Sequence, residues 1–286
     1  MNLCNIQEIK PFLEKRGFRF SKSMGQNFLI QSWVPEDIAD SSGADRSCGV
    51  LEIGPGIGCL TQQLSKRTGK VVSVELDKKL IPVLGETLSG CDNVEIINSD
   101  ILKVDIPELV KERFEGLRPI ACANLPYNIT TPVLSALIDT GLFESITVMI
   151  QREVAHRICA KPGTSDYGSF TVYANFYTDP EILFDVSPDC FIPQPKVTST
   201  VIRLTKRTAP PAEVKDEKLF FQLVRSAFAQ RRKTLANALA SGFGNLDKGT
   251  IHEIIRSCGF DERIRGEVLG ISEFAKLTNT LCEGTK

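Results

Sequence analysis

Residues that bind metals, build disulfide frameworks or cross membranes are scarce in this sequence. It contains only two histidines, and its nine cysteines are scattered without a C-x-x-C pair. We therefore expect neither a zinc site nor a disulfide framework, and reduced thiols favour the cytosol. No apolar run approaches the length that spans a bilayer, and the N-terminal residues lack the apolar core of a signal peptide. The expected protein is cytoplasmic, with no metal and no membrane partner.

Net charge is also nearly absent, but the basic residues are unevenly distributed. The whole chain of 286 residues has 34 Lys+Arg and 35 Asp+Glu, whereas residues 192–240 have ten basic and three acidic residues. Such an excess suggests a surface that faces a polyanion, although a solvated helix face would have the same composition. Its strongest run has four basic residues and no acid between positions 225 and 234. The candidates for phosphate contact are Arg225, Arg231, Arg232 and Lys233.

A glycine-rich turn follows the first apolar strand that the sequence predicts, at residues 50–53. Gly54 and Gly56 belong to a G-x-G-x-G pattern, which lacks the later glycine of the dinucleotide fingerprint. Such glycines let the backbone approach a ligand, and the helix expected next supplies free N–H groups. The following strand ends on Glu75, 21 positions after Gly54, where an acid can bind both hydroxyls of a ribose.

Polar side chains also follow the next two predicted strands. Asp100 comes after residues 94–97 and suits an adenine amine or the capping of a turn, and Asn124 comes after residues 120–123. Because the carboxyl ends of parallel strands meet at one edge of a sheet, we expect these side chains and Glu75 to line one pocket. No basic residue stands at the glycine turn to meet a phosphate. A ligand with a ribose and an adenine therefore fits S-adenosylmethionine better than a dinucleotide.

The stretch Asn124-Leu125-Pro126-Tyr127 is the predicted catalytic centre. An Asn side-chain oxygen and a backbone carbonyl offer two acceptors to the two N–H groups of an exocyclic amine, which would direct its lone pair at an electrophile. The ring of Tyr127 could stack on the base. Taken alone, these four residues are better interpreted as a strand-to-turn junction in which Pro126 and Tyr127 only pack, so the rest of the chain must decide.

A second aromatic residue, Phe191, precedes a loop that Pro193 and Pro195 stiffen. We expect this loop to expose Phe191 near the same edge of the sheet, where it could stack on the opposite face of a flipped base. A buried anchor of the loop is the alternative, and it is the better interpretation of Phe191 in isolation.

Composition and pattern divide the chain into two parts. An α/β domain is predicted over residues 1–207, and residues 208–212 are a linker by composition. Beyond the linker the patterns are helical, at residues 218–240, 248–258 and 271–281. A small all-α domain is therefore expected over residues 208–286.

These motifs together resemble the ribosomal RNA adenine N6,N6-dimethyltransferase family, in its small-subunit branch. The motifs that carry the resemblance occur in order at residues 25–29, 51–56, 124–127, 191–197 and 230–235. The resemblance implies a Rossmann-like class I methyltransferase sheet of seven strands, the last antiparallel, followed by a small helical domain that binds RNA. Cys59 departs from the family, which usually has alanine or another small residue there.

The resemblance also implies a reaction and a set of roles. S-Adenosylmethionine would be the donor, leaving as S-adenosylhomocysteine, and the substrate would be two neighbouring adenosines in a hairpin near the 3′ end of small-subunit (16S) rRNA. The RNA would be presented in an immature 30S-type particle to an enzyme that is monomeric when free. Asn124 and the Pro126 carbonyl would accept from the target amine, and Tyr127 and Phe191 would sandwich its base. The donor-binding residues would be Asn27, Leu29, Gly54, Gly56, Glu75, Asp100 and Asn124.

Two alternatives stay open at this point. One is a large-subunit rRNA adenine methyltransferase of the macrolide-resistance type, although Leu125 and the loop around Pro193 look more like the small-subunit branch. The other is a ribosome assembly factor or transcription factor that keeps the scaffold without catalysis. Glu75, Asp100 and residues 124–127 are all intact, which argues against lost catalysis.

Overall fold

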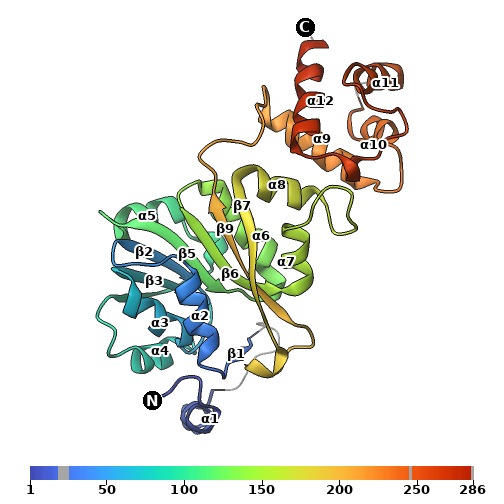
Figure 1. Ribbon diagram of the computed structural model, residues 1–286. Coiled ribbons are helices and arrows are strands. Elements are labelled where there is room, and N and C mark those ends of the chain that lie inside the picture. The colour runs from blue at the N-terminus through green and yellow to red at the C-terminus, as the bar shows by residue number, and fades with distance from the viewer. Residues whose placement is uncertain (19–25, 245–246, 285–286) are drawn as a thin grey trace. The chain divides into compact units, whose positions relative to one another are not determined.

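Two compact units make up the chain in the computed structural model, which describes residues 1–18, 26–244 and 247–284 (Figure 1). One unit comprises residues 1–155 with 180–206, and the other comprises residues 156–179 with 207–286. The second unit thus takes up a segment that precedes the last strands in sequence. Gly25 of the predicted N-terminal motif lies outside the described residues. The assignment of catalysis to residues 1–207 and of RNA binding to 208–286 stays a prediction.

A seven-stranded sheet in the order β4-β3-β2-β5-β6-β9-β7 forms the centre of the first unit. Neighbouring strands from β4 to β6 pair in parallel, whereas β9 pairs antiparallel with β6. The prediction of seven strands with the last one antiparallel is confirmed. The strands are β2 (Cys48–Ile53), β3 (Lys70–Glu75), β4 (Val94–Asn98), β5 (Arg118–Asn124), β6 (Ser145–Gln151), β7 (Thr178–Val186) and β9 (Ser199–Lys206).

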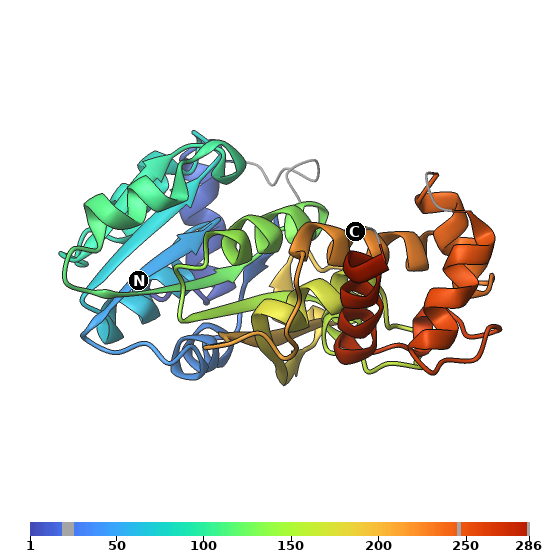
Figure 2. The same ribbon diagram turned by 90° about the horizontal axis from the view of Figure 1, so that it is seen from above.

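Helices cover both faces of this sheet, with α2 and α3 on one face and α5 and α6 on the other (Figures 1 and 2). Val50 and Ile120 of the sheet pack against Ile38 of α2 and Leu64 of α3 in one apolar cluster. Central strands read as continuous apolar runs because both faces are covered. The helices of this part are α1 (Ile6–Lys15), α2 (Trp33–Ser41), α3 (Cys59–Arg67), α4 (Ile81–Thr87), α5 (Ile106–Arg113), α6 (Thr130–Thr140) and the first half of α7 (Arg152–Ile158), which continues into the second unit.

The second unit is helical, as predicted for the C-terminal part of the chain. Phe220, Leu277 and Phe274 are fully buried at its centre. One expected helix, residues 218–240, is in fact two helices. The backbone turns at residues 230–233, and Thr234, whose own backbone is extended, is the N-cap of the second helix. The helices are α8 (Ser169–Tyr177), α9 (Glu217–Ala229), α10 (Leu235–Gly242), α11 (Lys248–Ser257) and α12 (Ile271–Gly284). Within the described ranges, no helix is long and apolar enough to cross a membrane.

Candidate active site

The glycine turn between β2 and α3 adopts backbone angles that favour glycine. Gly54 and Gly56 have φ values of 67° and 62°, in the left-handed region. A Cβ on Gly56 would also lie 3.0 Å from the ring of Phe28, so no larger side chain fits there without movement of the ring. The two glycines therefore allow the backbone of this turn to lie close to the carboxyl ends of the strands, as expected.

Glu75 ends β3 beside this turn, and its carboxylate is anchored by backbone groups. Oε1 accepts from the N–H of Asp77 at 2.7 Å, and Oε2 accepts from the N–H of Gly56 at 3.4 Å. Burial raises the pKa of Glu75, while the two N–H groups oppose that rise. A carboxylate has about four acceptor positions, so these bonds leave capacity for the hydroxyls of a ligand.

Asp100 follows β4 and begins a short 3₁₀ turn, Ile101–Lys103. Its Oδ1 accepts from the N–H of Leu102 at 3.1 Å, which is the capping role that the sequence left open. The residue also lines the same pocket as Glu75, so capping and ligand binding are compatible.

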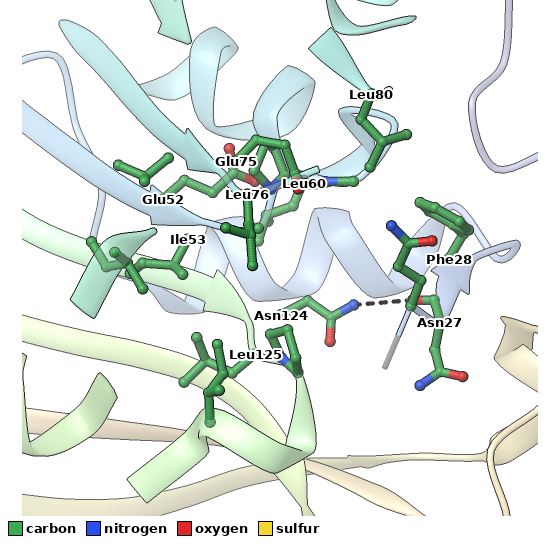
Figure 3. Close-up of a pocket in the computed structure, with 18 of the residues that line it drawn as sticks. Asn27, Phe28, Glu52, Ile53, Leu60, Glu75, Leu76, Leu80, Asn124 and Leu125 are labelled. Atoms are coloured by element: carbon green, nitrogen blue, oxygen red, sulfur yellow. Dashed lines mark hydrogen bonds between the residues drawn. The ribbon is translucent and has the colours of Figure 1, made fainter. Parts of the chain in front are cut away.

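Two short strands bring the N-terminal loop to the pocket. Leu29 of β1 (Phe28–Leu29) pairs antiparallel with Phe191 of β8 (Phe191–Ile192). This pairing places Asn27 next to the end of β5, where its carbonyl accepts a hydrogen bond from Nδ2 of Asn124 at 3.4 Å (Figure 3). The side-chain oxygen of Asn124 is directed away from Asn27. Across the residues that the structure describes, that oxygen accepts no hydrogen bond.

The Pro126 carbonyl was the predicted backbone acceptor for the target amine, but in the structure it is already hydrogen-bonded. The carbonyl of Pro126 accepts from the N–H of Ile129 at 3.2 Å and from the hydroxyl of Thr130 at 3.3 Å. Both of its lone pairs are therefore engaged at the start of α6, and the predicted role of this carbonyl as an amine acceptor does not fit. The carbonyl of Leu125, by contrast, accepts no bond from the described part of the chain, while its N–H donates to Met149 at 3.1 Å.

Tyr127 is held by its hydroxyl. The phenol oxygen lies 2.8 Å from the hydroxyl oxygen of Ser199, the first residue of β9. Burial raises the pKa of Tyr127 above its usual value, so the phenol is neutral at physiological pH. Tyr127 lines the same pocket as Asn124, and its hydroxyl is held by β9, which lies two strands away from β5 in the sheet.

Phe191 is buried, and the expectation of an exposed ring is wrong. Only 3% of the residue is accessible, and it packs in one cluster with Leu29, Val186 and Val201. It is absent from the residues that line the pocket, within the part of the chain described. The loop-anchor alternative is what the structure shows, because pairing with β1 covers the ring.

The pocket has a volume of about 260 Å³ and lies at the carboxyl ends of β2, β3, β4 and β5. Its described lining contains carboxylates but no basic residue. Glu52 is a lining residue that sequence reasoning missed, because it falls inside an otherwise apolar strand. All the predicted donor-binding residues line this pocket, namely Asn27, Leu29, Gly54, Gly56, Glu75, Asp100 and Asn124.

The four predicted phosphate contacts in the second unit are not equivalent. Arg231 forms an ion pair with Glu267 at 3.2 Å and donates to the carbonyl of Thr164 at 3.1 Å. Its guanidinium therefore joins segments within the unit. The other three, Arg225, Arg232 and Lys233, are exposed, and none has an ion pair with a described residue. Contact of any of them with RNA stays a prediction.

Comparison with known proteins gives consistent likenesses over almost the whole chain. Residues 17–273 match the family described as Ribosomal RNA adenine dimethylase. The chain is 49% identical over 284 residues to ribosomal RNA small subunit methyltransferase A of Bacillus cytotoxicus, covering 98% of this chain and 97% of that protein. It is 45% identical over 282 residues to the protein of the same name in Alkaliphilus oremlandii, covering 98% of each.

Two solved structures have the same fold. A dimethyladenosine transferase from Plasmodium falciparum superposes with a TM-score of 0.75 at 23% identity, covering 90% of this chain and 98% of that chain. The 23S rRNA methyltransferase ErmE superposes with a TM-score of 0.69 at 25% identity, covering 90% of this chain and all of that chain.

Proposed function

The chain belongs to the ribosomal RNA adenine dimethylase family, and from this premise we propose that it dimethylates the N6 amines of two adjacent adenosines near the 3′ end of 16S rRNA. The observation that carries the proposal is the Asn124 amide, anchored on Asn27 with its oxygen unused, at the edge of a pocket suited to an adenosine. The choice of the small subunit follows from the relatives named ribosomal RNA small subunit methyltransferase A.

The pocket fits S-adenosylmethionine as the donor. Its described lining has three carboxylates and no cation, which suits a positively charged nucleoside and not a phosphate. Glu75 would bind the ribose hydroxyls, Asp100 the adenine, and the backbone at Gly54 and Gly56 would pass close to the ligand. When bound, this donor supplies an electrophilic methyl group on a sulfonium sulfur and leaves as S-adenosylhomocysteine.

The catalytic stretch provides orientation and charge stabilisation. Oδ1 of Asn124 and the carbonyl of Leu125 accept the two N–H groups of the target amine, so its lone pair faces the methyl group. Positive charge develops on that nitrogen as the bond forms, and the two oxygen dipoles stabilise it before a proton is lost to water. Tyr127, neutral and fixed by Ser199, stacks on the base. A second round needs only one N–H, so one acceptor suffices.

The RNA is held by the helical unit. Arg225, Arg232 and Lys233 would neutralise phosphates of the rRNA, presented in an immature 30S-type particle in the cytoplasm. The enzyme would act as a monomer.

The alternatives are less well supported. A large-subunit, resistance-type enzyme is favoured only by the fold shared with ErmE, at 25% identity, against 45–49% with the small-subunit relatives. A factor without catalysis is disfavoured by the intact pocket, because Glu75, Asp100 and Asn124 all line it.

The decisive experiment is methyl transfer from labelled S-adenosylmethionine to small ribosomal subunits from a strain that lacks this modification, with large subunits as the control. Digested rRNA is analysed for N6,N6-dimethyladenosine. Product confined to the small subunit is expected. Label in the large subunit would select the resistance-type enzyme, and tight binding without label would select the non-catalytic factor.

A further inference from the structure

Glu52 is a buried carboxyl group in the wall of the donor pocket. It lies on β2 two residues before Gly54, and only 1% of it is accessible. Its Oε2 accepts a hydrogen bond from the hydroxyl of Ser73 at 2.6 Å. None of the described lysines, arginines or histidines forms an ion pair with it. A buried carboxylate without a cationic partner is costly, so Glu52 lowers the stability of the fold when it is ionised.

The groups that face Glu52 from the neighbouring elements add no positive charge. Glu75 approaches from β3 and disfavours a second negative charge; Figure 3 shows the two side chains on the same wall of the pocket. The thiols of Cys122 on β5 and Cys59 on α3 both lie close enough to feel its charge. The buried hydroxyl of Thr61 on α3 also faces it, without a hydrogen bond of ordinary geometry to any described group.

Burial therefore dominates and raises the pKa of Glu52 to about 7, although Ser73 opposes the rise. Near neutral pH, in the absence of a ligand, this carboxyl group is thus partly protonated. Any ligand that brings positive charge next to it shifts that balance toward the carboxylate.

We propose that Glu52 determines specificity for the methyl donor over the demethylated product, by releasing its proton when a cationic ligand enters the pocket. This inference rests on the proposed function, since it takes S-adenosylmethionine as the ligand. The O–H bond of the carboxyl group breaks, the proton passes to solvent, and the carboxylate stays as the counter-charge of the ligand.

The selectivity follows from a difference of one charge between the two ligands. S-Adenosylmethionine has a sulfonium, an ammonium and a carboxylate, whereas S-adenosylhomocysteine has a neutral sulfur. A ligand that lowers the pKa of Glu52 binds more tightly at alkaline pH than at acidic pH. The affinity ratio between these two pH limits is about 10-fold for each pKa unit by which the ligand lowers the pKa. Donor affinity should therefore rise through pH 7 more steeply than product affinity, which favours product release after transfer.

The test is isothermal titration of the purified full chain, without RNA, at pH 7 in buffers of different ionisation enthalpy. The dependence of the heat on the buffer gives the number of protons released. Wild type should release a fraction of a proton with S-adenosylmethionine and less with S-adenosylhomocysteine. The Glu52→Gln variant keeps the acceptor for Ser73 but has no proton to release, so the difference between the two ligands should disappear and their affinities should approach each other.

Controls separate this inference from other titrations. Glu115→Gln removes an exposed carboxylate elsewhere and should behave as wild type. Ser73→Ala removes the bond that favours the carboxylate, so the pH of greatest proton release should move upward; it also provides a readout if Glu52→Gln does not fold. The α-amino group, shared by both ligands, contributes equally in wild type and variant.

The outcomes are distinguishable from those that test the proposed function. Failure of both ligands to bind would overturn the choice of donor. Binding with the same proton release in wild type and Glu52→Gln, or an unmoved pH profile in Ser73→Ala, would overturn the role of Glu52 and leave the donor assignment intact.

Discussion

The side-chain nitrogen of Asn124 donates to the backbone carbonyl of Asn27, 3.4 Å away, and so joins the end of β5 to the loop before β1. This contact determines which end of the amide meets the pocket, because an amide whose nitrogen is bonded presents its oxygen to a substrate. The N-terminal loop therefore positions the amide that we propose to be catalytic, and it also lines the proposed donor pocket.

Removing this amide should separate chemistry from binding. We expect Asn124→Ala to lower kcat for methyl transfer to small subunits by about 100-fold or more, the usual cost of losing one preorganised group at a developing charge. Affinity for the RNA, which we assign to the helical unit, should stay near wild type in a filter-binding assay. Gln63→Ala on α3 is the matched loss of an amide away from the pocket and should retain activity. Normal turnover by Asn124→Ala would contradict the mechanism.

The hydroxyl and the ring of Tyr127 should have separable effects. Tyr127→Phe loses only the bond to Ser199 and should cost about 1 kcal/mol in the free energy of unfolding, with modest loss of activity. Tyr127→Ala also removes the ring on which we propose that the base stacks, and it should lose far more activity. The measurements are urea denaturation and steady-state methyl transfer.

Ser199→Ala provides the control for this pair. It should reproduce the stability loss of Tyr127→Phe, and the double variant should be no less stable than either single variant, because one bond is removed in all three. Additive losses would show that the two hydroxyls act independently.

Much of the site could be predicted because it obeys strong local rules. An apolar run, a glycine turn and an acid at the next strand end locate Gly54 and Glu75, since strand ends and left-handed turns have few sequence solutions. Phe191 could not be placed, because β1 and β8 are only two residues long and have no periodicity. The one available signal was the apolar pair Phe28–Leu29 in a polar loop, which needs a partner to bury it. Glu52 was missed because alternation does not indicate a buried carboxyl group in the wall of a pocket.

The two neighbouring arginines of the helical unit should respond differently to substitution. Arg231→Ala breaks the ion pair with Glu267, a partly exposed pair whose contribution to the free energy of unfolding is at most about 1 kcal/mol. Arg232→Ala leaves stability unchanged, but it should weaken RNA binding and reduce the slope of log affinity against log salt by about 1. Thermal denaturation and salt-dependent filter binding measure the two effects. An unchanged salt slope in Arg232→Ala would remove this residue from the RNA contact.

The raised pKa of Glu52 should also affect how the free energy of unfolding of the ligand-free protein depends on pH. In the unfolded chain the group titrates near its ordinary value of 4.5, and in the folded chain at about 7. Below pH 4.5 both states bind the proton, so the group has no effect on stability relative to a neutral side chain. As the pH rises from 4.5 to 7, the unfolded chain loses its proton while the folded chain retains it, so the cost of folding increases over this range and is constant above it. The cost grows to about 3 kcal/mol above pH 7.

Glu52→Gln should therefore gain about that much stability relative to wild type between pH 5 and pH 8 in urea denaturation, with Glu115→Gln unchanged. A constant difference between Glu52→Gln and wild type across that range would mean that the carboxyl group ionises freely in the fold, and the account of its burial would be wrong.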